Sequence, residues 1–160
     1  MSKLPAIRPT WFSFGGTAAI VTSMGLILGL QAAASSRQAI VGALLIVALA
    51  DNLSDSLSVH LYQEAERLEG RQAFISTVAN FATRLVVAST FVVLVLALPH
   101  NVLPWAAATW GMALLALLTH RIARSRGTPP AKEIAKHLAI AGVVLMVSDL
   151  LGTWLAAAFG

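Results

Sequence analysis

Leu49-Ala50-Asp51-Asn52-Leu53-Ser54-Asp55-Ser56-Leu57-Ser58-Val59-His60-Leu61-Tyr62-Gln63-Glu64-Ala65-Glu66 places two aspartates inside an apolar helical stretch. A charged side chain at bilayer depth costs about 2.5 to 3.5 kcal/mol on insertion scales, so such residues are candidates for an ion or proton path. Asp51 and Asp55 share one face of a helical wheel. The same face continues through Ser58, Tyr62 and Glu66. We therefore expect this helix to carry the functional residues and the other helices to enclose it.

The composition is typical of a membrane protein. Hydrophobic residues make up 58% of the chain and charged residues only 11%, against about a quarter in soluble domains. The 160 residues allow five spans of roughly 20 residues each and leave no room for a separate soluble domain. The Lys and Arg residues lie between apolar stretches, so they indicate the orientation of the spans and not a nucleic-acid partner. The absence of cysteine excludes disulfides and thiolate metal sites.

Hydropathy divides the chain into five apolar stretches joined by short polar segments. We expect one all-α membrane domain over residues 1–160, with spans at about 13–33, 38–62, 75–98, 105–119 and 135–158. A cleavable secretory signal is the competing interpretation of the first span, because Ala32-Ala33-Ala34 resembles a cleavage site. The length of the apolar run favours a retained span. Within it, Gly25 and Gly29 form a GxxxG motif that allows another helix to approach closely.

The connecting segments predict the topology. The helix with the two aspartates is expected to continue into water as an acidic extension and to end at Gly70. The segment His120–Glu133 is expected to be a basic loop, because Gly127 and the following prolines exclude a continuing helix. The distribution of Lys and Arg places the N-terminus in the cytoplasm and the C-terminus outside. An odd number of spans argues against an inverted duplication within one chain, so we expect a two-fold homodimer.

Carboxylate and hydroxyl oxygens on one helix face suit a divalent cation, which prefers oxygen ligands. Asp149 in the last span is expected at a depth similar to that of Asp51, so it could complete a site, as could a two-fold copy of Asp51. Metal binding competes with protons for such ligands, which is the exchange a proton-coupled transporter requires. The predicted metal ligands are Asp51, Asp55, Ser58, Asp149 and Glu66, and the predicted proton-coupling groups are Asp51, Asp55 and His60.

A structural role is the alternative for the same residues. Arg84 is expected about 13 Å inside its span, and Asp55 about 10 Å from the same membrane surface, which predicts an ion pair between them. Asp55 then only neutralises Arg84, and Asp51 only bonds the Asn and Ser groups around it. His60, near the water boundary, has the alternative role of an interfacial anchor.

Three stretches carry a family resemblance. The first is Thr22-Ser23-Met24-Gly25-Leu26-Ile27-Leu28-Gly29-Leu30, the second is residues 49–66, and the third is residues 135–160, with Ser148-Asp149-Leu150-Leu151-Gly152. In this order they resemble the LxLVLG-type run of the first helix, the end of the second helix and the last helix of the vacuolar iron transporter family of divalent-metal transporters. The resemblance implies a five-helix fold, a homodimer with the ion path between protomers, and exchange of Fe2+ or Mn2+ for protons.

The chain also departs from the family pattern. Ala18-Ala19 stands where the first helix of the family carries Asp-Gly, so a membrane metal ligand is absent there. In the second helix, Ser54-Asp55 and Ser58-Val59-His60 replace a Ser-Met pair and a Gly-Glu-Tyr. The long cytoplasmic metal-collecting region is shortened to residues 63–74. The carboxylate has then moved from the first helix to the second, or the site has lost its ancestral metal.

The sequence contains no nucleophile motif, HExxH, phosphate loop or dinucleotide fingerprint, so we expect no enzyme activity and no resident cofactor. Two functions remain. The first is a dimeric transporter that exchanges Fe2+ or Mn2+ for protons, and the second is a non-transporting membrane scaffold or sensor with a buried Asp/Arg network. The small size and the expected retention of the first span favour the cytoplasmic (inner) membrane of a prokaryote.

Overall fold

The computed structural model describes residues 10–65 and 70–159, and this part of the chain is helical, without strands. The elements in chain order are α1 (Thr10–Ala32), α2 (Arg37–Ile46), the π-helix η1 (Val47–Asp51), α3 (Asn52–Ala65), α4 (Gly70–Ala97), α5 (Leu103–Arg126) and α6 (Pro130–Phe159). Five helices are long and apolar enough to cross a membrane, with α2, η1 and α3 forming one of them over Arg37–Tyr62. The prediction of an all-α protein with five candidate spans is therefore confirmed.

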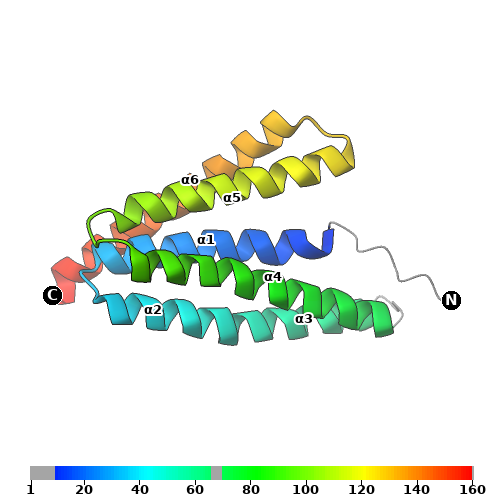
Figure 1. Cartoon of the computed structure of the whole chain (residues 1–160), viewed down its shortest axis with the longest axis horizontal. Helices are drawn as coiled ribbons and strands as arrows, with labels where there is room; N and C mark the ends of the chain where they lie inside the picture. Colours follow the sequence, from blue (N-terminus) through cyan, green and yellow to red (C-terminus); the bar gives the residue numbers. More distant parts are fainter. Residues whose placement is uncertain (1–9, 66–69, 160) are drawn as a thin grey trace.

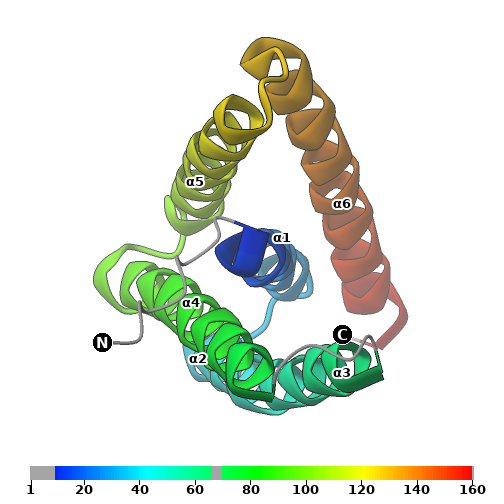
Figure 2. The same ribbon diagram turned by 90° about the vertical axis from the view of Figure 1, so that its right-hand side faces the viewer.

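Helix α1 is the centre of the bundle. It packs against α2, α4, α5 and α6, and a view along the helices shows α1 surrounded by the others (Figure 2). Successive spans run in opposite directions, so the ends of α1 and α3 lie at opposite ends of the molecule (Figure 1). The α5–α6 turn is at the end where α1 begins. We call this the basic-loop end, because His120, Arg121, Arg124, Arg126, Lys132 and Lys136 are near that turn.

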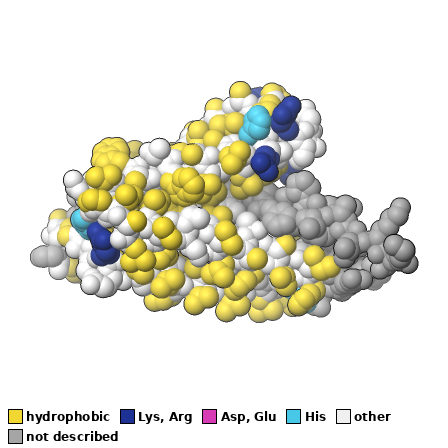
Figure 3. Space-filling model, in the orientation of Figure 1, with side chains coloured by type: hydrophobic (Ala, Val, Ile, Leu, Met, Phe, Trp, Pro, Cys, Tyr) yellow, Lys and Arg dark blue, Asp and Glu magenta, His cyan; other side chains and the backbone are white. Residues whose placement is uncertain are grey.

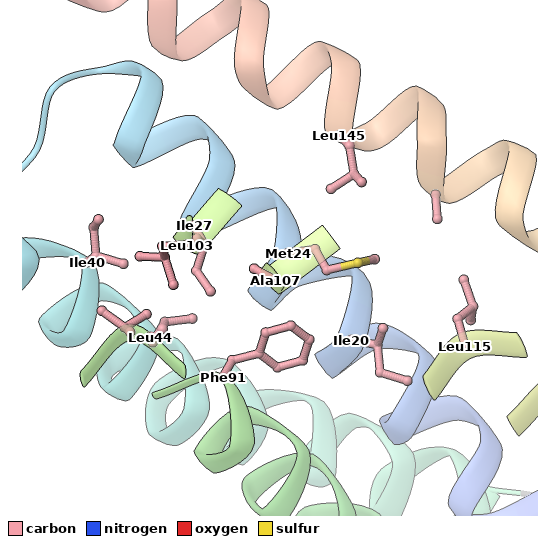
Figure 4. Close-up of a cluster of buried hydrophobic side chains, with 12 residues drawn as sticks. Ile20, Met24, Ile27, Ile40, Leu44, Phe91, Leu103, Ala107, Leu115 and Leu145 are labelled. Carbon is pink, nitrogen blue, oxygen red and sulfur yellow. The ribbon is translucent and has the colours of Figure 1, made fainter. Parts of the chain in front are cut away.

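Buried residues recur at every fourth position on three helices, the spacing of the i±4 ridges by which helices interlock. These stripes are Ile40, Leu44, Ala48, Asn52 and Ser56 on α2–η1–α3; Ser76, Asn80, Arg84 and Ala88 on α4; and Leu103, Ala107, Gly111, Leu115, Thr119 and Ala123 on α5. Figure 4 shows the apolar part of this core, where Ile20, Met24 and Ile27 of α1 cluster with Leu44, Phe91 and Leu103. The core is thus apolar between the first turns of α2 and the last turns of α4, at the end of the molecule opposite the basic-loop end. It is polar where α3 meets α4.

Small residues allow α1 and α6 to approach closely. A Cβ atom added at Gly29 would lie 3.1 Å from the backbone oxygen of Ser148, and one added at Gly25 would lie 3.0 Å from its hydroxyl. A Cβ atom at Gly152 would overlap the carbonyl oxygen of Gly29. The prediction that the Gly25–Gly29 motif serves a close helix contact is confirmed.

One predicted connection is wrong in its bounds. Helix α5 continues to Arg126, and α6 begins at Pro130, so the basic segment is mostly helical and the turn is only residues 127–129. Gly127, with φ 68°, is the left-handed cap of α5, and Pro130 occupies the first position of α6, where its missing N–H costs nothing. Gly70 is the first residue of α4 and Ala65 the last described residue of α3, so the predicted acidic extension over residues 66–69 lies outside the described residues.

The outer surface is apolar along the middle of the helices. Large side chains more than half exposed include Ile46, Leu53, Leu57, Val86, Val93, Leu150 and Trp154. Figure 3 shows hydrophobic side chains over the middle of one face, with Lys, Arg and His side chains towards its two ends. Such a surface is expected of helices that contact lipid, and it indicates an integral membrane protein.

Candidate functional site

Arg84 of α4 binds both acids of the second span. Its Nη2 lies 2.6 Å from Asp51 Oδ2, and its Nη1 donates to Asp55 Oδ2. The Arg84 side chain is only 5% exposed, whereas those of Asp51 and Asp55 are 49% and 35% exposed. The structure therefore contains the predicted Arg84–Asp55 ion pair and adds Asp51 to it. We call these three residues the Asp–Arg–Asp cluster.

The backbone before the acid pair is a π-helix. Residues Val47–Asp51 form η1, and the flanking Ile46 and Asn52 keep right-handed helical dihedral angles, so the span is continuous through it. Single π-turns inside α-helices occur frequently at functional sites, because the wider turn changes which side chains face the partner helix. Here the π-turn ends at Asp51, the first residue that binds Arg84.

The cluster lies deep along its helix. Asp51 is about 21 Å from Arg37 and about 17 Å from Tyr62, counted at the helical rise per residue, so it is near the middle of the Arg37–Tyr62 span. One guanidinium and two ionised carboxylates carry one uncompensated negative charge. A net charge at this depth is costly, and residues that carry one are candidates for ion or proton binding.

Polar side chains without partners lie on the inner side of the cluster. Asn52 is fully buried and its amide nitrogen donates to the Phe81 carbonyl at 2.9 Å, but its Oδ1 has no hydrogen-bond partner. The Ser56 hydroxyl, one turn further along α3, and the Asn80 amide nitrogen, one turn before Arg84 on α4, are also buried without partners. Unsatisfied buried polar groups are uncommon and indicate ordered water or a functional polar site. We call Asn52, Ser56 and Asn80 the inner polar seam.

Helix α1 packs closely against Asn80 and Arg84 but supplies no acidic side chain to the cluster. A Cβ atom at Gly15 would overlap the Asn80 side chain and lie 2.9 Å from Arg84 Cγ, so a glycine is required beneath these two side chains. Ala18 is partly buried and Ala19 buried. The first helix therefore supplies space for Asn80 and Arg84, while the carboxylates come from the second span.

The remaining predicted ligands of the second span lie away from the cluster or outside the described residues. Ser58 is exposed, and its hydroxyl donates to the Ser54 carbonyl at 3.0 Å, as expected of a serine on a helix surface. Tyr62 is 67% exposed. His60 is partly buried and follows Asn52 and Ser56 at the same four-residue spacing. Glu66 lies outside the described residues.

The structure does not bring Asp149 to the cluster. Asp149 is an exposed residue of α6, and the adjacent Ser148 packs against Gly25 and Gly29 of α1. Arg84, which binds Asp51, instead lies beside Gly15, so the residues next to the two acids meet α1 at levels about 15 Å or more apart along its axis. The prediction of similar depth is wrong, because it counted residues as if all helices began at the same level. Among residues 10–65 and 70–159, no three His, Asp or Glu side chains gather as a group that could hold a metal ion.

The inner polar seam is the feature that the sequence interpretation missed. A signal was present, because Asn52, Ser56 and His60 follow at intervals of four residues, as do Ser76, Asn80 and Arg84. An uncharged amide or hydroxyl is far less costly to bury than a carboxylate. The structure accordingly buries Asn52 and Ser56 and leaves the two aspartates at the edge of the helix interface.

Fold and site together define a helical membrane protein with five candidate spans and a buried guanidinium held by two carboxylates. In comparisons with known proteins, no family model matches the chain, and no curated protein or solved structure is similar to it. The resemblance to the vacuolar iron transporter family therefore stays a prediction that depends on its short motifs.

Proposed function

We propose that this protein is a membrane transporter in which Asp51 and Asp55 bind a transported cation and exchange it for protons. The observation that carries the proposal is the charge of the Asp–Arg–Asp cluster, where one buried guanidinium meets two partly exposed carboxylates. The remaining negative charge attracts a proton or a metal cation, and the exposed faces of the carboxylates are open to it. A purely structural ion pair would need only one acid.

The cargo proposed from the resemblance is Fe2+ or Mn2+. With Arg84 in place the cluster offers one net negative charge, which is too little to offset the dehydration of a divalent ion. A divalent cargo then requires either displacement of Arg84 or another carboxylate. A two-fold homodimer supplies the second possibility, because a copy of Asp51 from the partner would cover the half-exposed Asp51 and complete the ligand set. We propose this dimer with the N-terminus in the cytoplasm of a prokaryotic cell.

A non-transporting scaffold or sensor is the second candidate. It is favoured by the burial of Arg84, whose two nitrogens join α4 to α3 and to the end of η1. In that case the cluster stabilises the helix contact and no ion passes. The two functions differ in what removal of a carboxylate changes, which is flux in the first and chiefly stability in the second.

Uptake into proteoliposomes tests the proposal. The purified protein is reconstituted with an imposed pH gradient, and Fe2+ and Mn2+ uptake is compared among the wild type, Asp51→Asn and Asp55→Asn. Asn101→Ala, in the exposed turn between α4 and α5, is the matched control. We expect saturable, gradient-dependent uptake that both aspartate variants lose and the control keeps. Asp149→Asn shows separately whether the last span contributes a ligand.

Stability must be measured on the same samples. If a variant loses uptake but has the same unfolding stability as the wild type, the result supports a transport role for the substituted carboxylate. A folded wild-type protein that moves neither ion, and acidifies no vesicles when the panel is extended to monovalent cations, would reject transport and leave the scaffold function.

A further inference from the structure

A cavity with several polar lining residues lies at the basic-loop end, away from the Asp–Arg–Asp cluster. Its volume is about 460 Å3, and α1, α5, α6 and the α5–α6 turn all contribute to its lining. Its polar lining includes Thr17, Thr119, Arg126, Glu133 and His137. None of these residues belongs to the cluster or to the inner polar seam.

The cavity presents a cation and an acid that do not neutralise each other. Arg126 comes from the last turn of α5 and Glu133 from the first turn of α6. Within the described residues the ion pairs formed by Arg84 are the ones present, so neither Arg126 nor Glu133 is engaged in one. Each is available to a ligand group of opposite charge.

Thr119 adds a hydroxyl group to the lining of the same cavity. The residue is 6% exposed. The Thr128 hydroxyl donates to the Ala123 carbonyl, and His137 Nδ1 is 2.7 Å from the Glu133 carbonyl oxygen.

The charged end of the cavity is expected at the level of lipid headgroups. Helix α5 has 24 residues and is about 36 Å long, which exceeds the hydrocarbon thickness of about 30 Å. Its C-terminal residue Arg126 therefore reaches the headgroup layer at the basic-loop end. Thr119 lies about 10 Å deeper along the helix, and Ala18, Ile122 and Ala123 add apolar lining to the cavity. Basic pockets between membrane helices commonly bind lipid phosphates.

We infer that this cavity binds an aminoalkyl phosphate, the headgroup of phosphatidylethanolamine. Arg126 and the Thr119 hydroxyl bind the phosphate, and the Glu133 carboxylate binds the ammonium group. The same chemistry is offered by free phosphoethanolamine. A headgroup with phosphate but no amine leaves Glu133 unpaired, and a quaternary ammonium cannot donate a hydrogen bond to it.

Native mass spectrometry of the full chain in detergent tests the inference. Three lipids with identical acyl chains are titrated separately: phosphatidylethanolamine, phosphatidylcholine and phosphatidylglycerol. We expect phosphatidylethanolamine to bind about tenfold more tightly than the other two, since a hydrogen bond to a charged group is worth about that factor. Glu133→Gln is expected to abolish this preference without weakening phosphatidylcholine, and Arg126→Gln to weaken all three about tenfold.

Arg121→Gln is the matched control, because Arg121 is exposed on the same helix and does not line the cavity. Thr119→Val, which keeps the shape of the side chain, is expected to weaken binding of all three lipids severalfold. The unfolding temperature of each variant, measured without added lipid, verifies that the fold is retained.

The outcomes separate the possible sources and the alternatives. Displacement of the lipid by free phosphoethanolamine at similar concentration supports the same site with a soluble ligand, and failure to displace supports the membrane lipid. Equal binding of the three lipids overturns the inference. It is also overturned if Glu133→Gln keeps the preference, or if Arg121→Gln loses binding as readily as Arg126→Gln, which indicates general attraction to the basic end.

Discussion

Arg84 Nη2 lies 2.6 Å from Asp51 Oδ2 while the neighbouring Nη1 donates to Asp55, so one guanidinium joins two carboxylates that are one helical turn apart. The arginine is buried and the acids are partly exposed. Removal of the arginine therefore leaves two like charges together, whereas removal of either acid leaves a balanced pair. This asymmetry makes the cluster testable by charge deletion alone.

Arg84→Gln is expected to lower the free energy of unfolding by about 3 kcal/mol, because it leaves two carboxylates without a partner at the helix interface. Asp51→Asn, which leaves one arginine and one acid, is expected to cost about 1 kcal/mol. Equilibrium unfolding in one detergent compares the two. The double variant should be more stable than Arg84→Gln alone, and equal losses for the two single variants would contradict the charge argument.

Gly152→Ala is expected to destabilise the protein by about 2 kcal/mol, because the added methyl group would overlap the Gly29 carbonyl oxygen and push α6 from α1. Gly142→Ala on the same helix is the control, since nothing lies within 4 Å of its added Cβ. The control should be neutral or up to about 1 kcal/mol more stable, because alanine favours a helix. Equal thermal stabilities of the two variants would refute close packing at Gly152.

Gly127→Ala is expected to cost about 1 kcal/mol through the backbone alone. The φ angle of 68° is unfavourable for a residue with a Cβ atom, and no side chain would be met there. Gly127→Asn should cost less, since asparagine tolerates the left-handed conformation better. Thermal unfolding ranks the three proteins, and a ranking with alanine above asparagine would show that the cap does not limit stability.

Ser56→Ala is expected to stabilise the fold by about 1 kcal/mol, because it removes a buried hydroxyl without a partner. If the inner polar seam serves the transported ion, the same variant slows uptake. Ser89→Ala is the control: this serine is exposed, and its hydroxyl donates to the Leu85 carbonyl at 2.8 Å. A clear loss of stability in Ser56→Ala would mean that its hydroxyl has a ligand or water as its partner.

Much of the fold could be predicted because it depends on local composition. Each span is an apolar run long enough to cross a bilayer, and the Gly25–Gly29 contact follows from a short motif. The pairing of Arg84 with Asp55 follows from their distances to the same helix ends, since these two helices are joined by a short connection. The depth predicted for Asp149 was wrong, because α6 begins five residues before the predicted span and its Ser148 lies beside Gly25 and Gly29 of α1.

Other features have no local signature. Helix α5 extends through Arg121, Arg124 and Arg126. Their charge led to the prediction of a loop, although arginine is a good helix former. The sequence interpretation placed the acidic face of α3 at the functional interior, but the residues that the structure buries there are the uncharged Asn52 and Ser56. The cavity between Arg126 and Glu133 depends on three helices meeting, which a single sequence does not reveal.

The π-turn keeps two faces of one long helix in register. A π-turn contains about one residue more than an α-turn, so Val47–Asp51 takes up one additional residue without turning α2 against α3. A regular α-helix through the same residues would rotate α2 against α3 by about 100°. Either Ile40 and Leu44 would then leave the apolar core, or Asp51 would turn away from Arg84. The wider turn therefore lets the apolar core and the paired acids keep their partners on the same side of one span.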